Sequence, residues 1–420
     1  VMRFYLWIPW LAWSLVGCGS ESETDAATHE AGIDAHADAQ VDAAVDARED
    51  AVEDAVTDSS IDGAETGDSS DVAPDIEKDT QNVDATNDVL EAGLPTGCLV
   101  GDYQPYFGNL HAHTSYSDGK GLPSEAFAHA RQQAGLDVQV ITDHLEQLYW
   151  PNPSGRWDKC RQQADDAYEP GAFVALCGFE YGSGFHGIKS TGHNNVFFSD
   201  KLFPMVQLDF RDFYKTLVAC ANCIGQFNHP GDESEQTWSG FEYHADADDR
   251  IQFFEFNGAG DVWNLYFAAL DKGWHVSAVM NQDNHSADWG TKNDNRSGLW
   301  MPELTREGLR DTMLARRTFM TRDRNATLRL MAENQCWMGS VLQGVSSIDV
   351  FVEAKDADAG EGYATLELYG PGKTLLGKKD CQAASVCTME QSISAVAYVL
   401  ARATQVDGDE LVSAPIWLEP

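Results

Sequence analysis

Six histidines stand where short apolar runs end, each with a carboxylate, a glycine or an asparagine nearby. They are His111, His113, His144, His193, His229 and His285. The carboxylates of Asp118, Glu180 and Asp283 occupy similar places. Neutral imidazoles and carboxylates together are ligands for zinc, manganese or iron. The pattern predicts a metal centre, with divalent metal ions (Zn, Mn or Fe) as the cofactors.

The spacing of these residues favours convergence on one point. His111 and His113 are two residues apart at the end of a predicted strand, and so are Asp283 and His285, so each pair shares one face. In (β/α) barrels the strand ends share one rim, where catalytic groups collect. A histidine that only caps a loop or fills a core hydrogen bond is the alternative. We keep that interpretation for the histidines without this context, namely His29, His36, His129, His186, His244 and His275.

Short apolar runs alternate with helical stretches through the middle of the chain. Strands are expected at 107–114, 138–142, 173–181, 194–198, 224–228, 251–256 and 276–281, and helices at 124–134, 210–219, 262–272 and 304–317. This alternation predicts a parallel sheet or barrel. Beyond about residue 323 the helical period disappears, and strands at 326–331, 347–353, 364–369, 393–401 and 414–418 predict a small β-sandwich. We place a domain boundary near Arg322.

The ordered set of motifs has a family resemblance over about residues 104–322. It resembles the PHP (polymerase and histidinol phosphatase) metallohydrolases in His111-Ala112-His113-Thr114, Ser117-Asp118-Gly119, Thr142-Asp143-His144, Glu180, Gly192-His193-Asn194, Asn228-His229-Pro230 and Asp283-Asn284-His285. The stretches 304–319 and 413–417 resemble a bacterial branch of the family that includes carbamate and ester hydrolases.

The resemblance implies an α/β fold, a distorted (β/α)7 TIM-like barrel, with three metal ions. The first ion is expected on His111, His113, Glu180 and Asp283, the second on Glu180, His193 and His229, and the third on Asp118, His144 and His285. Some members of the family have histidine where this chain has Asp118. Glu180, Asp283 and His285 are the candidate catalytic residues, and Asp143 is expected to orient the imidazole of its neighbour.

These expectations point to a metal-dependent hydrolase. Two metal ions that share a carboxylate lower the pKa of a bound water molecule, which then attacks a phosphorus or carbonyl centre. A phosphoester bond in a small molecule is the favoured target, and a carboxylic or carbamic ester is the second. A lipoprotein that binds a metal or ligand without turnover is the rival from another class. Trp157 and Trp289 either contact a partly apolar substrate or pack their own loops.

The charge of the chain excludes whole classes of protein. The 420 residues carry a formal net charge of −39, and residues 19–97 contain 23 acidic against 2 basic residues. A nucleic-acid binder needs a basic face, which neither residues 19–97 nor the rest of the chain offers. The stretch 19–97 has no aromatic residue and repeats aspartate every fourth position from Asp34 to Asp58, which predicts a disordered, extended tether. No apolar run approaches the roughly 20 residues that span a bilayer.

The first eighteen residues have the pattern of an export signal. Arg3 precedes the apolar run 4–16, and Leu15-Val16-Gly17-Cys18 resembles a bacterial lipobox. We expect export, lipidation of Cys18 and anchoring at the cell envelope, at the outer membrane rather than the inner one. The lipid would be the only membrane contact, and no obligate protein partner is evident. The expected domains are therefore 1–18, 19–97, 98–322 and 323–420.

Export permits disulfide bonds among the other eight cysteines. Cys381 and Cys387 are the most plausible local pair, and Cys220-Ala-Asn-Cys223 is interpreted as structural. Eight cysteines allow 105 pairings, so the remaining connectivity is left open.

Overall fold

A computed structural model gives the structure of residues 94–149, 153–182, 192–205, 210–231, 237–257 and 261–420. The expected signal peptide, Cys18, His186 and all but the last four residues of the expected tether lie outside these ranges. In the part of the chain that is described, no helix has both the length and the apolar character needed to cross a membrane.

Strands and helices alternate through the first part of the described chain, as the apolar runs predict. The strands are β1 (Gln104–Asn109), β2 (Val138–Ile141), β3 (Val174–Cys177), β4 (Phe179–Gly182), β5 (His193–Phe197), β6 (Ile224–Phe227), β7 (Ile251–Glu255), β8 (Ser277–Val279), β9 (Arg296–Met301) and β10 (Thr318–Thr321). The helices are α1 (Pro123–Gln132), α2 (Leu145–Tyr149), α3 (Pro153–Ala167), α4 (Phe210–Ala219), α5 (Thr237–Phe241), α6 (Ala245–Asp248), α7 (Val262–Asp271) and α8 (Arg306–Leu314). Thr305 is the N-cap of α8, and its side chain accepts a hydrogen bond from the Gly308 amide.

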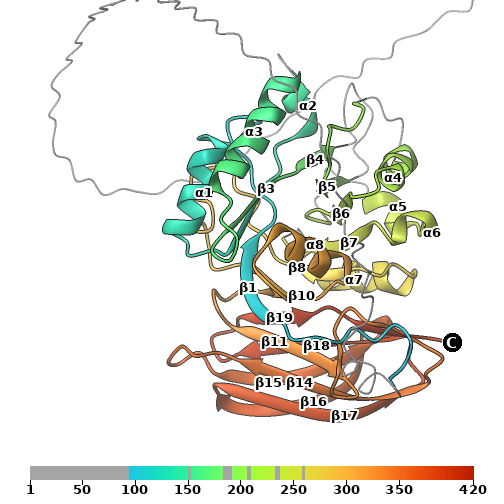
Figure 1. Ribbon diagram of the computed structural model, residues 1–420. Coiled ribbons are helices and arrows are strands. Elements are labelled where there is room, and N and C mark those ends of the chain that lie inside the picture. Colours follow the sequence, from blue (N-terminus) through green and yellow to red (C-terminus); the bar gives the residue numbers. More distant parts are fainter. Residues whose placement is uncertain (1–93, 150–152, 183–191, 206–209, 232–236, 258–260) are drawn as a thin grey trace, which may run out of the picture. The chain divides into compact units, whose positions relative to one another are not determined.

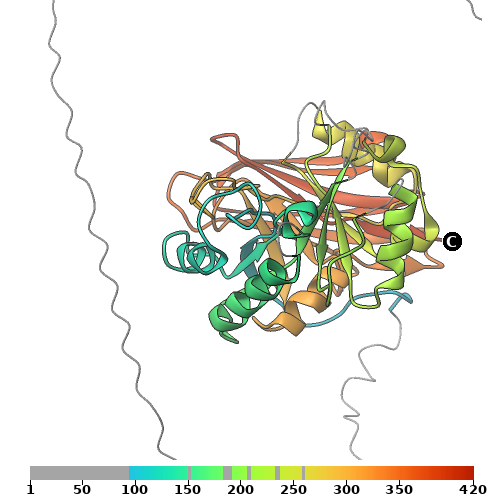
Figure 2. The ribbon, with the colours of Figure 1, turned by 90° about the horizontal axis from the view of Figure 1, so that it is seen from above.

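These strands form two sheets rather than one. In the first sheet β1 pairs in parallel with β2, β2 in parallel with β3, and β1 antiparallel with β9. The second sheet has the order β4-β5-β6-β7-β8. β5 runs antiparallel to both of its neighbours, whereas β6, β7 and β8 are parallel. The helices lie outside the strands, with α1 and α3 on one side and α4 on the other (Figures 1 and 2).

The chain changes sheets at Gly178, between β3 and β4. A Cβ atom at Gly178 would lie 2.4 Å from the carbonyl oxygen of Val196, so the backbones approach too closely for any other residue. The single strand expected over 173–181 is therefore two strands in different sheets. Both sheets still contribute to one apolar cluster, with Val140 and Val174 from the first and Phe253 and Val279 from the second.

The structure supports one part of the expected (β/α)7 barrel, namely the mixed α/β class. It does not support the closed barrel among the described strands. Among the described residues, the backbone pairing between the two sheets is limited to isolated bridges, between Ala112 and Asn284 and between His144 and Glu180. Among the described strands, pairing does not close into a ring. The antiparallel β5 explains part of this difference, because a (β/α) barrel requires parallel neighbours throughout.

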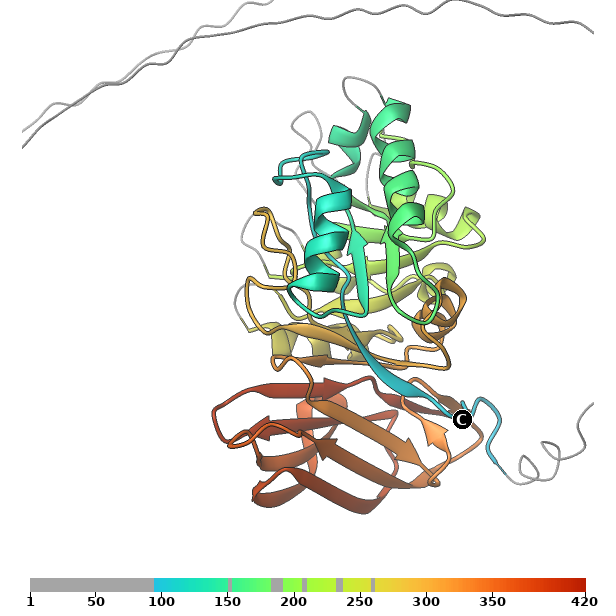
Figure 3. The ribbon, with the colours of Figure 1, turned by 60° about the vertical axis from the view of Figure 1, so that its left-hand side comes forward.

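Strands dominate the C-terminal part, as the loss of the helical period predicts. They are β11 (Thr327–Ala332), β12 (Cys336–Trp337), β13 (Val341–Gln343), β14 (Ser347–Lys355), β15 (Tyr363–Gly370), β16 (Thr374–Ala384), β17 (Val386–Ser394), β18 (Tyr398–Gln405), β19 (Glu410–Ser413) and β20 (Ile416–Glu419), with a short 3-10 helix, η2 (Pro371–Lys373). β12, β11, β14 and β17 form one sheet, and the other six strands extend the sheet that contains β1. These strands are drawn in orange to red in Figure 3. The strand expected over 393–401 was wrong, because Ala395 takes a positive φ of 58° and ends β17.

One sheet runs through the expected domain boundary near Arg322. β10 pairs with β9 on one side and with β19 on the other, so hydrogen bonds connect the two parts. Leu94, within the expected tether, already packs against the apolar cluster of the C-terminal strands. The division at Arg322 therefore stays a prediction.

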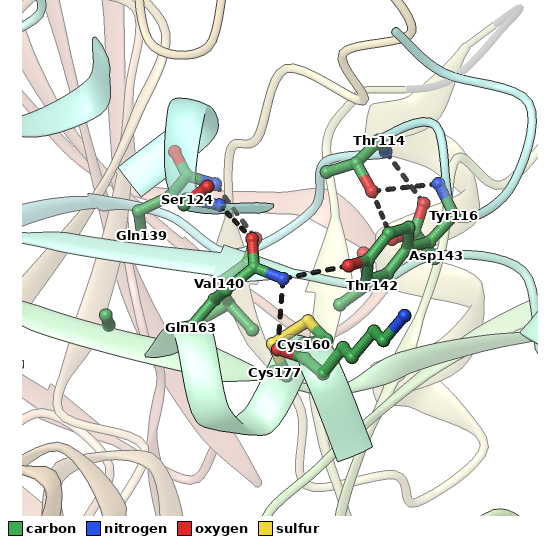
Figure 4. The surroundings of a disulfide bond; sticks show 12 residues. Thr114, Tyr116, Ser124, Gln139, Val140, Thr142, Asp143, Cys160, Gln163 and Cys177 are labelled. Atoms are coloured by element: carbon green, nitrogen blue, oxygen red, sulfur yellow. Dashed lines mark hydrogen bonds between the residues drawn. A yellow bond between two sulfur atoms is a disulfide. The ribbon is translucent and has the colours of Figure 1, made fainter. Parts of the chain in front are cut away.

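Four disulfide bonds involve all eight cysteines of the described chain. The expected pair Cys381–Cys387 is confirmed. The others are Cys98–Cys336, Cys160–Cys177 and Cys220–Cys223. Cys160–Cys177 joins α3 to the end of β3, directly before the chain changes sheets (Figure 4). It therefore fixes the approach to Glu180.

Candidate metal centre

The nine predicted ligands come together around Glu180. His111 and His113 follow β1, His144 follows β2, His193 opens β5, His229 follows β6, and Asp283 and His285 follow β8. Nε2 of His111 and Nε2 of His113 lie 3.2 Å apart, as their two-residue spacing predicts. The strand ends therefore converge as expected, although the described strands do not form a closed barrel.

Glu180 is the centre of the cluster, with a side chain only 1% exposed. Its Oε1 lies 3.1 Å from Nδ1 of His193 and 3.1 Å from Nε2 of His229. Its Oε2 lies 3.2 Å from Nε2 of His113 and 3.1 Å from Nδ1 of His144. Oε1 also lies 3.4 Å from Nε2 of His111. The two oxygens therefore face different sets of imidazoles, which is the arrangement of a carboxylate shared between two metal ions.

Asp283 stands beside the first pair of histidines. Its Oδ1 lies 3.3 Å from Nε2 of His111 and 3.1 Å from Nε2 of His113. This oxygen is buried, yet it accepts no hydrogen bond of ordinary geometry from the described residues. Asp283 and His229 also have positive φ angles, of 46° and 25°. Such strain at non-glycine residues is characteristic of functional sites.

Asp118 and His285 form the open side of the cluster. Their side chains are 45% and 41% exposed, and Oδ1 of Asp118 lies 3.3 Å from Nε2 of His285. Oδ2 of Asp118 is 3.6 Å from Nε2 of His144. These two side chains are the most exposed of the nine.

The side chains form four overlapping sets whose donor atoms lie within 4.8 Å of one another. These sets are His113, Asp118, His144 and His285; His111, His113 and Glu180; His111, His229 and Asp283; and His144, Glu180 and His193. They differ from the expected grouping in three places. His229 lies with Asp283, His144 lies with Glu180, and His113 also joins the set that contains Asp118. The nine residues are thus one continuous cluster rather than three separate sites.

Glu255 belongs to the cluster and was missed by the sequence analysis. It ends β7, is fully buried, and its Oε1 lies 3.1 Å from Nδ1 of His111. It also accepts hydrogen bonds from Nδ2 of Asn281 (2.9 Å) and from the amide of His229 (2.8 Å). The available signal was its position, a lone carboxylate among apolar residues at the end of a strand.

Asp143 does not take the role expected for it. Its carboxylate accepts hydrogen bonds from the amide and the hydroxyl of Thr114 (2.7 and 2.6 Å) and from the hydroxyl of Ser117 (2.5 Å). The contact with Thr114 is drawn in Figure 4. Consecutive residues of an extended chain point to opposite sides, which separates this carboxylate from the His144 ring. Asp143 therefore holds the loop that carries Asp118.

A layer of buried amides lies beneath the ligands. Nδ2 of Asn228 donates to Oε1 of Glu180 (2.8 Å) and to Oδ1 of Asn195 (2.9 Å). Nδ2 of Asn109 donates to Oδ1 of Asn284 (2.9 Å), a link between the ends of β1 and β8. Because buried polar groups need partners, this network restricts the positions that the ligands can take.

The two tryptophans considered for substrate contact are packing residues. Trp289 is 2% exposed, and its indole N–H donates to the carbonyl oxygen of His113 (2.9 Å). Trp157 is 4% exposed and packs edge-on against Phe179. The described histidines without strand-end context, namely His129, His244 and His275, have other contacts. Nδ1 of His275, for example, lies 2.6 Å from Oδ2 of Asp248.

Charge in the cluster is strongly coupled. Burial disfavours ionisation of Glu180, but the charges of His111, His193 and His144 hold the pKa of its carboxyl well below the usual value. Burial also opposes protonation of His113 and His229, but contacts with Glu180, and with Asp283 for His113, raise the pKa of each imidazole to about 9. The hydrogen bond with His144 lowers the pKa of Asp118 to about 2.

The donor set fits divalent metal ions. Imidazole nitrogens and carboxylate oxygens converge, and the buried oxygen of Asp283 faces ring nitrogens without an ordinary hydrogen bond. Zinc, manganese and iron accept this mixture of ligands, whereas calcium prefers oxygen alone. His111, whose Nδ1 faces Glu255, presents Nε2 to such an ion.

Comparisons with known proteins give limited information. A model of a protein family of unknown function, DUF3604, matches residues 123–212. This stretch includes Glu180 and His193 but not His111 or Asp283. None of the curated proteins compared with the chain matches it.

Two solved structures are similar to the chain. One is a two-domain protein from Bacteroides vulgatus described as containing a predicted PHP-like metal-dependent phosphoesterase, at 17% identity and a TM-score of 0.42, covering 74% of this chain and 94% of that one. The other is the lesion-specific endonuclease PfuEndoQ from Pyrococcus furiosus, at 16% identity and a TM-score of 0.35, covering 50% and 56%. Similarity at this level does not establish a shared activity, so the function is argued from the site itself.

Proposed function

We propose that this protein is a metal-dependent hydrolase that cleaves a phosphoester bond in a small molecule. A cluster of two or three divalent ions on the nine residues would acidify a water molecule and neutralise charge that develops on the substrate. The proposal includes membership of the PHP family, on the resemblance of the sequence motifs.

One observation carries the proposal, namely the position of Glu180. Oε1 of this buried carboxylate faces His111, His193 and His229, and Oε2 faces His113 and His144, so the residue is placed to bridge two ions. A protein that only stores a single ion has no need for such a bridge. The donation from Asn228 to Oε1 holds the bridge in one orientation.

The residues of the chain have distinct tasks around this bridge. His111 is held by Glu255 with Nε2 facing inward, and His113 is fixed through its backbone by Trp289. Asp118 and His285 stand at the open side, where they would meet the substrate first. Asp283 lies between the buried and the open parts and is the candidate for holding a proton during turnover.

The balance of charge links the number of metal ions to the substrate. Four carboxylates surround the six histidines, namely Asp118, Glu180, Glu255 and Asp283. Two divalent ions would cancel their charge, and three would leave a surplus of two positive charges. Such a surplus stabilises a phosphoryl dianion more than a neutral ester. A centre with three ions therefore favours hydrolysis of a phosphoester. A centre with two ions would favour the second candidate, a carboxylic or carbamic ester.

The test combines metal reconstitution with a substrate panel. The protein is treated with chelator, reloaded with Zn, Mn or Fe, and assayed with chromogenic phosphate monoesters, phosphate diesters and carboxylic esters. We expect activity to disappear with the chelator, to return with metal, and to be greatest on a phosphoester. Activity that ignores both treatments would contradict the proposal. Full metal binding without turnover of any ester would support the rival, a protein that binds metal without catalysis.

We also propose that the chain is exported and anchored through a lipid on Cys18. The support is the lipobox-like sequence 15–18 alone. Mass spectrometry of the N-terminal peptide from membrane fractions is the test. A diacylglycerol-sized mass increase on Cys18 is expected, and a free thiol at this position would contradict it.

A further inference from the structure

A second group of carboxylates lies among the C-terminal strands. Asp323 precedes β11, Asp356 follows β14 and Glu361 precedes β15. One oxygen from each lies within 4.8 Å of an oxygen of the other two. Asp323 is only 6% exposed and Asp356 only 2%. Three like charges are thus gathered at a largely buried place.

The described part of the chain supplies no basic partner for these carboxylates. None of the three forms an ion pair with a described lysine, arginine or histidine. Arg324, adjacent to Asp323, is directed instead to Asp294, with Nε 2.5 Å from Oδ1. Buried charges normally have a partner of opposite sign, so the cluster requires a cation or a shared proton.

Two further oxygens beside the cluster have no partner. Tyr363 and Gln405 face each other across β15 and β18, and both are at most 1% exposed. Nε2 of Gln405 donates to Oδ2 of Asp356 (2.6 Å), which places this amide at the cluster. Within the described residues, Oε1 of Gln405 and the hydroxyl of Tyr363 form no hydrogen bond. Buried oxygens of this kind are normally satisfied by an ordered water molecule or an ion.

The hydroxyl of Tyr363 is within electrostatic range of the same carboxylates. Burial raises the pKa of this phenol, and the charges of Asp356 and Asp323 raise it further. Its cross-strand pairing with Gln405 puts both side chains on one face of the sheet.

We propose that Asp323, Asp356 and Glu361 bind a calcium ion, with Gln405 and Tyr363 beside it. Every donor is an oxygen, and no imidazole or thiolate is present, which separates this site from the histidine-rich centre. Calcium accepts irregular sets of carboxylate and carbonyl oxygens, whereas magnesium demands nearly ideal octahedral geometry. The ion would join the start of β11 to the segment between β14 and β15, and so stabilise the C-terminal strands.

The site can be tested with terbium, a luminescent probe for calcium sites. Full-length protein is treated with chelator, titrated with Tb³⁺ under excitation of its aromatic residues, and then titrated with Ca²⁺. We expect a saturable emission that Ca²⁺ displaces. The acidic stretch 19–97 contains no aromatic residue and contributes little to this signal. Glu361→Gln should weaken the Ca²⁺-displaceable component at least tenfold, while the exposed control Glu390→Gln, on β17, should leave it unchanged.

Further variants separate this site from the metal centre and from misfolding. Glu180→Gln should retain the Ca²⁺-displaceable signal, because it alters only the histidine-rich centre. Tyr363→Phe keeps all three carboxylates but should reduce the sensitised emission. Ca²⁺ should raise the Tm of the wild-type protein and of Glu390→Gln by several degrees, but not that of Glu361→Gln. Identical Tb³⁺ titrations and Tm shifts for Glu361→Gln and Glu390→Gln would overturn the proposal.

Discussion

Oε1 of Glu255 lies 3.1 Å from Nδ1 of His111, behind the ring and away from the centre of the cluster. This contact leaves Nε2 of the same ring facing Glu180 and Asp283, at 3.4 and 3.3 Å. Glu255 also receives the backbone amide of His229, so it positions two histidines at once. A carboxylate behind a ligating imidazole fixes the ring and raises its basicity. The metal centre thus depends on a residue that is not itself a predicted ligand.

Substitution Glu255→Gln should weaken metal binding about 10- to 100-fold, the usual effect of losing such a partner. The amide keeps the size of the side chain but not its charge, so the His111 ring becomes a poorer ligand. Competitive metal titration measures the affinity, and kcat/KM measures the consequence for turnover. Glu390→Gln removes an exposed charge of the same kind and is the control. Equal affinities for the two variants would show that Glu255 does not support the centre.

Stability of the chelator-treated protein should fall between about pH 6.5 and 9. The pKa values of His113 and His229 are raised to about 9 in the folded protein, against 6.5 in the unfolded chain. A raised folded-state pKa gives stability that is complete below 6.5 and lost as the pH rises through 9. Each histidine contributes up to about 3 kcal/mol, and the contributions overlap because both contact Glu180.

Urea unfolding at pH 6.5 and 9.5 in the presence of chelator measures this loss. Protein reloaded with metal should show the opposite trend between acidic and neutral pH, because ligands must be deprotonated to bind. His229→Asn should reduce the pH dependence of the chelated protein. A flat profile for the chelated wild type would contradict the charge coupling described for the cluster.

Substitutions at Asp143 and Asp118 should have different effects. The first should lower the free energy of unfolding, and the second should lower the metal content. Asp143→Asn weakens three hydrogen bonds to Thr114 and Ser117, and we expect a loss of about 1–3 kcal/mol in the free energy of unfolding. Asp118→Asn changes a side chain that is 45% exposed, so it should lower the metal content with little loss of stability in chelator. Urea unfolding and elemental analysis of both variants distinguish the two effects. The idea that Asp143 holds the loop fails if Asp143→Asn unfolds at the wild-type urea concentration.

Gly178→Ala should be strongly destabilising because of where the chain changes sheets. The added methyl group would lie 2.4 Å from the carbonyl oxygen of Val196, so the backbones of two strands would have to separate. We expect a loss of about 1–3 kcal/mol or more, together with reduced metal affinity, since Glu180 is two residues away. Gly344→Ala is the control, with φ of 69° and open space around the added methyl, and should lose only about 1 kcal/mol. A smaller effect at Gly178 than at Gly344 would refute this interpretation.

The side chains that gather around Glu180 were accessible from sequence because local rules mark them. Spacing of two residues put His111 and His113 on one face, and the ends of apolar runs marked the other candidate ligands. Glu255 escaped notice because its partner, His111, is 144 residues away and no local pattern joins them. The prediction that Asp143 orients His144 was wrong for a related reason, since the hydrogen-bond partners of Asp143 lie in the loop after a different strand.

The architecture was predictable in class but not in pairing. Apolar periodicity identified the alternating elements and the strand-rich C-terminal part. It did not reveal that 173–181 divides at Gly178, since an apolar run has the same composition whether it serves one sheet or two. Likewise, the turn at Ala395 depends on a positive φ at a residue that rarely adopts one. Whether the strands close into a ring or form two sheets depends on which strands pair, and strand pairing joins residues that are far apart in the sequence.

Anomalous scattering from crystals soaked in Mn²⁺ or Zn²⁺ tests the central claim most directly. The account predicts at least two peaks beside Glu180, one near each carboxylate oxygen, at roughly 2.0–2.2 Å. A third peak is expected near Asp118, His144 and His285. One isolated peak that leaves either oxygen of Glu180 without metal, or no peak within the cluster, would contradict the bridging role from which the proposed hydrolysis follows.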